Sequence, residues 1–194
     1  MSTLNVTNIK ATDGTSGLSI ANSTGVVTFN NPPVNVGVSN LQMFRVNANQ
    51  TSTTSPTTIT AWTDGHGTQT FQRIGNAWSV SSGVFTPSVS GLYEIMFSAE
   101  VYANSEVRYV QFDYHFSTNS GGVYSAHTMY GCIPRLNSDT TYTNFNFPRY
   151  YNITNAANFR FALKFSAHST AVTMRGGSTN DISQIVFKRL ADAQ

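Results

Sequence analysis

The sequence predicts an all-β protein folded as a two-sheet sandwich or barrel. Apolar and polar residues alternate with a period of two along much of the chain, and no helical periodicity persists. Ten or so such segments follow one another at short spacing, which is typical of sandwiches and barrels. The composition agrees, because aromatic residues reach 12% while charged residues make up only 10%, and Ser, Thr and Asn suit an exposed pleated surface.

Residues 1–38 differ from the rest and are expected to form an extended, β-like attachment segment. They contain no Tyr or Trp, and turn-forming residues separate their short apolar alternations. Such a segment cannot bury a core alone, so it must dock on sister copies or on a larger partner. The residues expected to make this attachment are Leu4, Val6, Ile9, Leu18, Ile20 and Phe29.

Residues 39–194 are expected to form one β-domain. The clearest strand spans 158–168, where Phe159, Phe161 and Phe165 share one face. Segments 92–101 and 110–116 repeat this alternation. Further strands are expected at 42–48, 57–62, 69–74, 84–86, 123–129, 141–147, 171–174 and 182–190.

The apolar residues of these strands are the predicted core and subunit-contact residues. They are Phe44, Phe85, Tyr93, Ile95, Phe97, Phe159, Phe161, Phe165, Ile185 and Phe187. Segment 92–101 also carries Leu92 and Met96 on its opposite face, and Tyr102 follows in the same register. A sheet with apolar residues on both faces favours a partner, so we expect self-association.

The sequence contains no signature of an enzyme. It has neither a Gly-x-Ser-x-Gly elbow nor a phosphate-binding Gly-Lys-Ser/Thr loop. Its four histidines share no metal-ligand spacing, and Asp64 with His66 fits a turn better than a metal site. We therefore expect a non-enzymatic protein with no catalytic residues, no cofactor and no metal ligands.

Charge and cysteine content exclude further classes of function. The net charge is only +2 and no run of Lys or Arg occurs, which argues against nucleic-acid binding. The single cysteine, Cys132, cannot form an intrachain disulfide and is expected to be a buried or half-buried apolar residue. No secretory signal or membrane-length apolar stretch is present, so we expect synthesis in a cytoplasm without membrane insertion.

Three aromatic residues are candidates for glycan contact. Trp62, Tyr150 and Tyr151 would offer rings for stacking against sugars. The alternative is that they cap the ends of the sandwich, with the aromatic body packed and the polar tip solvated.

Residues 71–93 resemble the globular head of the complement q-subcomponent, a branch of the tumour necrosis factor-like jelly rolls. Gly83, Phe85, Pro87, Gly91 and Tyr93 stand at the spacing of that family's motif. A looser resemblance covers about residues 39–190. The family's Gly-Asp is replaced here by Ala157-Asn158, and there is no Gly-x-y collagen stalk, so an animal complement role is not expected.

The resemblance implies a two-sheet antiparallel jelly roll that assembles as a homotrimer around a threefold axis. It implies that the strands starting near Leu41, Leu92, Asn158 and Ile182 form the axis-side sheet. Some relatives bind calcium near the axis, for which Asp113 and Asp181 are the candidates here.

The first segment resembles the N-terminal stretches of tail-fibre-like proteins from phages of marine (cyanobacterial) bacteria. The residues that carry this resemblance are 3–10, 18–20 and 25–29. It implies a structural virion protein, either a head decoration or fibre or a tail appendage, assembled in the host cytoplasm. Its partners would be other capsid or tail proteins and a host cell-surface glycan. The alternative is a free lectin-like, glycan-binding module of the same fold.

Overall fold

The computed structural model describes residues 8–10, 16–20, 27–29, 38–64, 73–105, 107–133 and 140–194. The chain divides into two compact units, Met1–Gly37 and Val38–Gln194. The division lies one residue before the end expected for the attachment segment. Two residues expected to make the attachment, Leu4 and Val6, lie outside the described residues.

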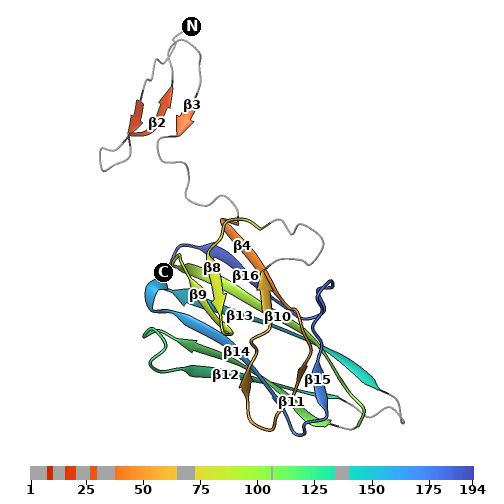
Figure 1. The fold of residues 1–194 in the computed structure, drawn as a ribbon. Coiled ribbons are helices and arrows are strands. Elements are labelled where there is room, and N and C mark those ends of the chain that lie inside the picture. Colours follow the sequence, from red (N-terminus) through yellow and green to blue (C-terminus); the bar gives the residue numbers. More distant parts are fainter. Residues whose placement is uncertain are drawn as a thin grey trace. The chain divides into compact units, whose positions relative to one another are not determined.

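The first unit contains a three-stranded antiparallel sheet in the order β1-β2-β3 (Figure 1). Its strands are β1 (Asn8–Lys10), β2 (Ser16–Ile20) and β3 (Val27–Phe29). The register sets Leu18 opposite both Ile9 and Phe29. The other four predicted attachment residues, Ile9, Leu18, Ile20 and Phe29, therefore all lie on paired strands.

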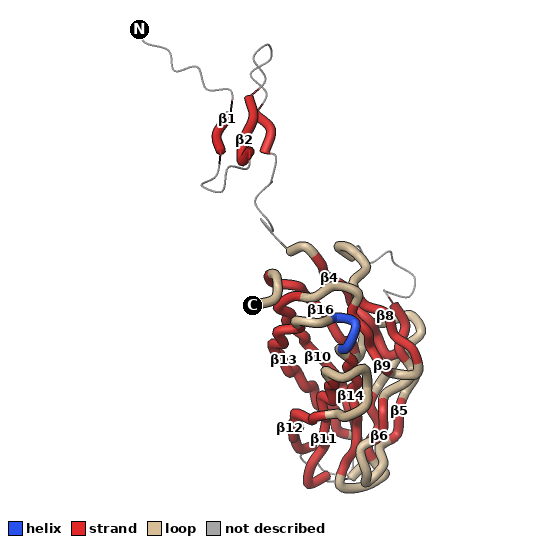
Figure 2. Tube along the Cα trace, turned by 90° about the vertical axis from the view of Figure 1, so that its left-hand side faces the viewer, coloured by secondary structure: helices blue, strands red, loops and turns tan. Residues whose placement is uncertain are grey.

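The second unit is an antiparallel jelly-roll sandwich of two sheets, which confirms the expected fold class (Figure 2). The first sheet comprises β4 (Asn40–Val46), β5 (Gln50–Thr51), β7 (Trp62–Asp64), β10 (Gly91–Ala103), β13 (Thr141–Ile153), β15 (Val172–Met174) and β16 (Gln184–Ala191). The second comprises β6 (Thr57–Thr58), β8 (Trp78–Ser81), β9 (Val84–Pro87), β11 (Val107–Ser117), β12 (Ser125–Ile133) and β14 (Arg160–Ala167). A short 3-10 helix, η1 (Ala156–Asn158), precedes β14.

One expected strand assignment to a sheet is wrong. Strand β14, which contains most of the predicted strand at 158–168, lies in the second sheet rather than beside β4, β10 and β16. It pairs with β11 over eight positions, from Ser117 opposite Arg160 to Val110 opposite Ala167. The neighbour of β10 at this edge of the first sheet is β13 instead. Alternation identifies the faces of a strand but not the sheet that accepts it.

Other strands also differ from expectation: β8 lies where none was expected, and the strand expected at 69–74 lies mostly outside the described residues. The strand expected at 57–62 is divided into β6, which pairs with β14, and β7, which pairs with β4, because the chain crosses between the sheets. Strand β13 continues beyond its expected end through Pro148. In the described residues β13 pairs only with β10, so it is an edge strand, where a proline without an N–H is tolerated.

Aromatic rings fill the space between the two sheets. Phe85 lies at the centre, with ring centroids 5.1 Å from Phe44, 5.2 Å from Trp62 and 5.0 Å from Phe187. Trp78 stacks on Phe187 at 4.1 Å. Edge-to-face and stacked pairs of this kind stabilise a core beyond the area that they bury.

Two glycines of the family motif at residues 83–93 are required because other parts of the backbone pass close to them. Gly83 has φ of +79°, and a Cβ there would lie 2.4 Å from the Ile59 carbonyl oxygen. A Cβ on Gly91 would lie 2.7 Å from the Ala191 carbonyl oxygen. The motif glycines therefore let the β8–β9 turn and the start of β10 pack against neighbouring backbone.

Candidate functional site

The outward face of the first sheet carries a row of apolar residues. Strand β10 alternates strictly, so that Leu92, Met96 and Tyr102 point outward and are half-buried while their neighbours enter the core. The register places Pro148 and Val186 on either side of Met96, with Met43, which is itself only 6% exposed, beyond Val186. Met43, Met96, Pro148 and Val186 are called the apolar row below. A solvated antiparallel face normally carries polar residues at such positions.

Charged residues on this face are paired within the subunit. Glu94 of β10 lies 3.8 Å from the Lys188 ammonium and accepts a 3.0 Å hydrogen bond from the Tyr150 hydroxyl. This bond is the main reason that the pKa of Tyr150 is raised. On the other side of the apolar row, Glu100 forms an ion pair with Arg175, whose guanidinium lies 5.5 Å from the centre of the Tyr142 ring. Both β10 carboxylates thus have a cationic partner.

The ten predicted core and contact residues lie inside one subunit. None is more than 4% exposed; they are Phe44, Phe85, Tyr93, Ile95, Phe97, Phe159, Phe161, Phe165, Ile185 and Phe187. None of them is therefore exposed for contact with another subunit. The outward residues of β10 can be identified in the sequence because they alternate with these inward residues, one position apart.

The predicted aromatic surface for sugars is not assembled. Trp62 is 8% and Tyr151 is 7% exposed, whereas Tyr150 is 62% exposed. The Trp62 indole Nε1 donates a 2.7 Å hydrogen bond to the Ile59 carbonyl. Neighbours on a strand point to opposite faces, so Tyr150 and Tyr151 cannot share a surface. Trp62 and Tyr151 therefore belong to the core, where neither ring is open to a sugar and neither polar tip is solvated as the capping alternative expects.

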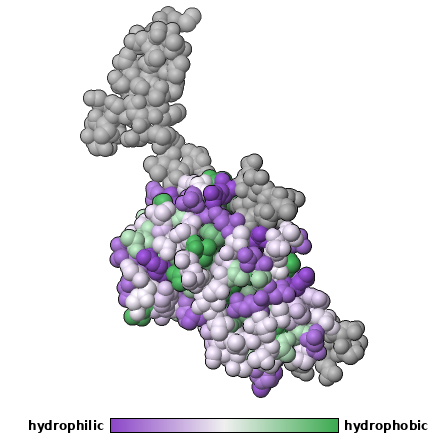
Figure 3. Space-filling model, viewed as in Figure 1, coloured by the Kyte–Doolittle hydropathy of each residue, from purple (hydrophilic) through white to green (hydrophobic). Residues whose placement is uncertain are grey.

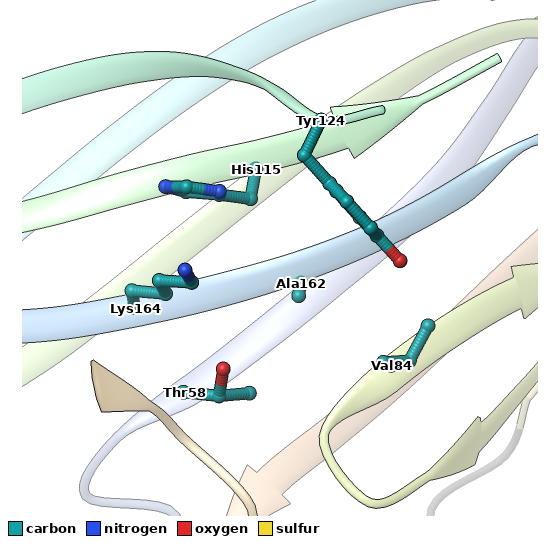
Figure 4. A pocket seen from close by; sticks show the side chains of 6 residues that line it. All are labelled: Thr58, Val84, His115, Tyr124, Ala162 and Lys164. Carbon is teal, nitrogen blue, oxygen red and sulfur yellow. The ribbon is translucent and has the colours of Figure 1, made fainter. Parts of the chain in front are cut away.

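A hollow lies on the outward face of the second sheet, centred on Ala162 of β14. Register places Val84 of β9 and His115 of β11 on either side of Ala162, and Thr58 of β6 beside Lys164. The hollow has a volume of about 340 Å³ and is lined by Thr58, Val84, His115, Tyr124, Ala162 and Lys164 (Figure 4). It exists because alanine leaves space where the surrounding positions carry longer side chains.

The polar groups around the hollow carry different charges. Burial, and secondarily the Lys164 charge, lower the pKa of His115 below 6.5, so its imidazole is neutral at pH 7. Asp113 is 3% exposed and lies 4.0 Å from His115 Nε2. Its two carboxylate oxygens accept hydrogen bonds of 3.0 and 2.9 Å from the Gln111 amide. Within the described residues, no carboxylate lies within 4.0 Å of the Lys164 ammonium.

The structure also locates the acidic residues and histidine considered as metal ligands, and the single cysteine. Asp113 belongs to β11 of the second sheet, so it cannot serve an axial calcium site on the first, while Asp181 precedes β16. His66 lies outside the described residues, among which no cluster of His, Cys, Asp or Glu could hold a metal. Cys132 is exposed, contrary to expectation.

The visible face of the second unit is largely polar, with hydrophobic residues in small separate patches (Figure 3). This appearance agrees with the Ser, Thr and Asn content of the sequence. Among the described residues, no helix has the length and apolar character needed to span a bilayer.

No protein-family model matches the sequence, and no curated protein matches it either. Solved structures do resemble it, among them three crystal structures of murine APRIL determined at pH 5.0, 8.5 and 8.0. Their TM-scores are 0.47, 0.44 and 0.44, and each is 10% identical in sequence. Each likeness covers 78% of this chain and 98% of the APRIL chain. The likeness concerns the fold alone.

Proposed function

We propose that this chain is a non-enzymatic structural protein of a bacteriophage particle, which assembles as a homotrimer. Its first unit attaches to the particle, as a head decoration or fibre or as a tail appendage, and its jelly roll projects for contact with the host surface. The observation that carries the proposal is the apolar row on the outward face of the first sheet.

The face that carries the apolar row suits contact with further copies of the same chain. Around a threefold axis, three copies of each residue near the axis approach one another, so unpaired charges of one sign there would repel. Here Glu94 and Glu100 are already compensated by Lys188 and Arg175. Burying the half-exposed Met96 and Val186 between subunits would remove apolar surface from water, which is favourable.

The role in a virion is supported by the first segment. Its resemblance to tail-fibre-like proteins covers the residues that form β1, most of β2 and β3. Three short strands with few apolar residues are too small to form a stable core alone, which favours docking on another structural protein. As part of this proposal, the protein is incorporated into virions that are assembled in the host cytoplasm.

Light scattering on the purified chain tests the trimer. We expect a mass about three times that of the 21.1 kDa chain. Met96→Glu would set three carboxylates near the axis and should give monomers. Thr128→Glu, an equally polar change at an exposed position of β12 in the second sheet, should leave the trimer intact. A wild-type mass of one chain would rule out the trimer.

Deletion of residues 1–37 tests the attachment. Particles produced with the shortened protein should lose it, as measured by mass spectrometry of purified virions, although the jelly roll is retained. Unchanged incorporation would show that attachment does not use the first unit.

A further inference from the structure

We propose that the hollow over Ala162 binds an anionic sugar residue of a surface glycan. This inference rests on the adhesive part of the proposed function. The residues that line the hollow are different from those proposed to form the trimer. The six lining side chains come from four strands, β6, β9, β11 and β14, and from Tyr124 just before β12 (Figure 4).

The size and lining of the hollow suit one ring-shaped unit. A volume of about 340 Å³ is at the low end for ligand pockets. Val84, Ala162 and the Tyr124 ring supply apolar surface for the C–H face of a sugar. The Thr58 hydroxyl, the Tyr124 hydroxyl and the His115 imidazole can exchange hydrogen bonds with sugar hydroxyls.

The charge of the hollow selects the kind of sugar. Lys164 supplies the positive charge in the lining, since His115 is neutral at pH 7. Asp113 stands directly opposite Lys164 in the β11–β14 register, but it lies outside the lining, and its two oxygens accept hydrogen bonds from the Gln111 amide. An ammonium that has no carboxylate partner within 4.0 Å among the described residues is available to a carboxylate or sulfate group of the ligand.

The hollow is also well placed for adhesion. It is on the second sheet, and the proposed subunit contact uses the first, so trimer formation would leave three hollows exposed. Three weak sites on one particle component, repeated around the particle, would bind a glycan-covered surface far more tightly than one site does.

Titration calorimetry with the full chain tests the site. The probes are an oligosaccharide containing uronic acid, a sulfated oligosaccharide, a neutral oligosaccharide and a poly-glutamate peptide. We expect binding to one or both acidic sugars, which distinguishes carboxylate from sulfate as the preferred group, and none to the neutral sugar or peptide.

Two variants should weaken this binding by different routes. Lys164→Gln removes the charge and should weaken binding about tenfold, as expected for a lost charged hydrogen bond. Ala162→Leu fills the floor of the hollow and should abolish binding. Arg108→Gln is the matched control, because it removes the same charge from an exposed position of β11 outside the hollow. Melting temperatures establish that each variant is folded.

Several results would overturn the site. They are no binding of either acidic sugar by the wild type, equal binding of poly-glutamate, or unchanged binding by both folded Lys164→Gln and Ala162→Leu. Each of these leaves the trimer mass and the particle incorporation untouched, so failure of this inference is distinguishable from failure of the proposed function.

Discussion

At the scale of single residues, Gln42 shows how one buried amide joins the two sheets. Its Nε2 donates a 3.0 Å hydrogen bond to the Trp78 carbonyl, and its Oε1 accepts a 2.9 Å bond from the Trp78 N–H. Gln42 belongs to β4 and Trp78 to β8, so the pair connects the first sheet to the second. A buried peptide group that loses both partners keeps its desolvation cost without compensation.

Gln42→Met keeps the length of the side chain and removes both bonds to Trp78, together with the longer Nε2 bonds to Asn76 at 3.3 Å and Asp64 at 3.5 Å. We expect it to lower the free energy of unfolding by about 2 kcal/mol or more, measured by urea denaturation. Gln50→Met is the control, because the single Gln50 bond to Thr57 is exposed, and its cost should stay below about 0.5 kcal/mol. Equal costs for the two variants would contradict this role.

His115 gives the domain a predictable pH dependence. Its pKa is lowered in the folded state, mainly by burial, so the unfolded state binds the proton more readily. Stability should therefore be complete above pH 6.5, the ordinary histidine value, and decrease as the pH falls toward the folded pKa. In His115→Gln the melting temperature should fall less between pH 7 and acid pH than in the wild type. The same substitution at exposed His168 controls for the loss of an imidazole, and identical pH profiles for His115→Gln and wild type would refute the prediction.

At the scale of strands, Gly131 of β12 leaves the space that the ring of Phe145 of β13 occupies. A Cβ on Gly131 would lie 1.8 Å from Cε1 of Phe145, and 2.6 Å from its Cζ. Phe145 is 9% exposed and packs against Phe112 at 5.6 Å. The absence of one side chain therefore lets the edge strands of the two sheets approach each other over a shared ring.

Gly131→Ala should displace the Phe145 ring and cost about 1–3 kcal/mol of unfolding free energy, as overpacking does. Thermal denaturation measures the change. Gly122→Ala is the control, since a Cβ there would come no closer than 3.1 Å to the end of the Asn119 side chain. If Gly131→Ala were as stable as Gly122→Ala, the close approach would have no energetic role.

At the scale of the whole molecule, the second unit holds its own core. The chain divides between Gly37 and Val38, and every residue of the described hydrophobic core lies beyond that division. We expect residues 38–194 alone to melt at the same temperature as the full chain and to keep its trimeric mass, since the apolar row is retained. A lower melting temperature for the shortened chain would show that the first unit stabilises the jelly roll.

The sequence by itself determined the all-β class and the faces of the main strands. Period-two alternation is a local property, so Phe97 could be assigned inward and Met96 outward from neighbouring letters alone. The family motif also marked Gly83 and Gly91, although the approach of the Ile59 and Ala191 backbone that requires them is a tertiary feature.

Only the tertiary structure decided which sheet each strand joins and which side chains lie next to each other on neighbouring strands. The alternation of β14 is the same in either sheet, and pairing with β11 settles its place. The hollow over Ala162 needs Thr58, Val84 and His115 side by side, which are far apart in sequence and meet only through strand register. Burial of Trp62 and Tyr151 likewise follows from the packing of distant strands, which no local pattern encodes.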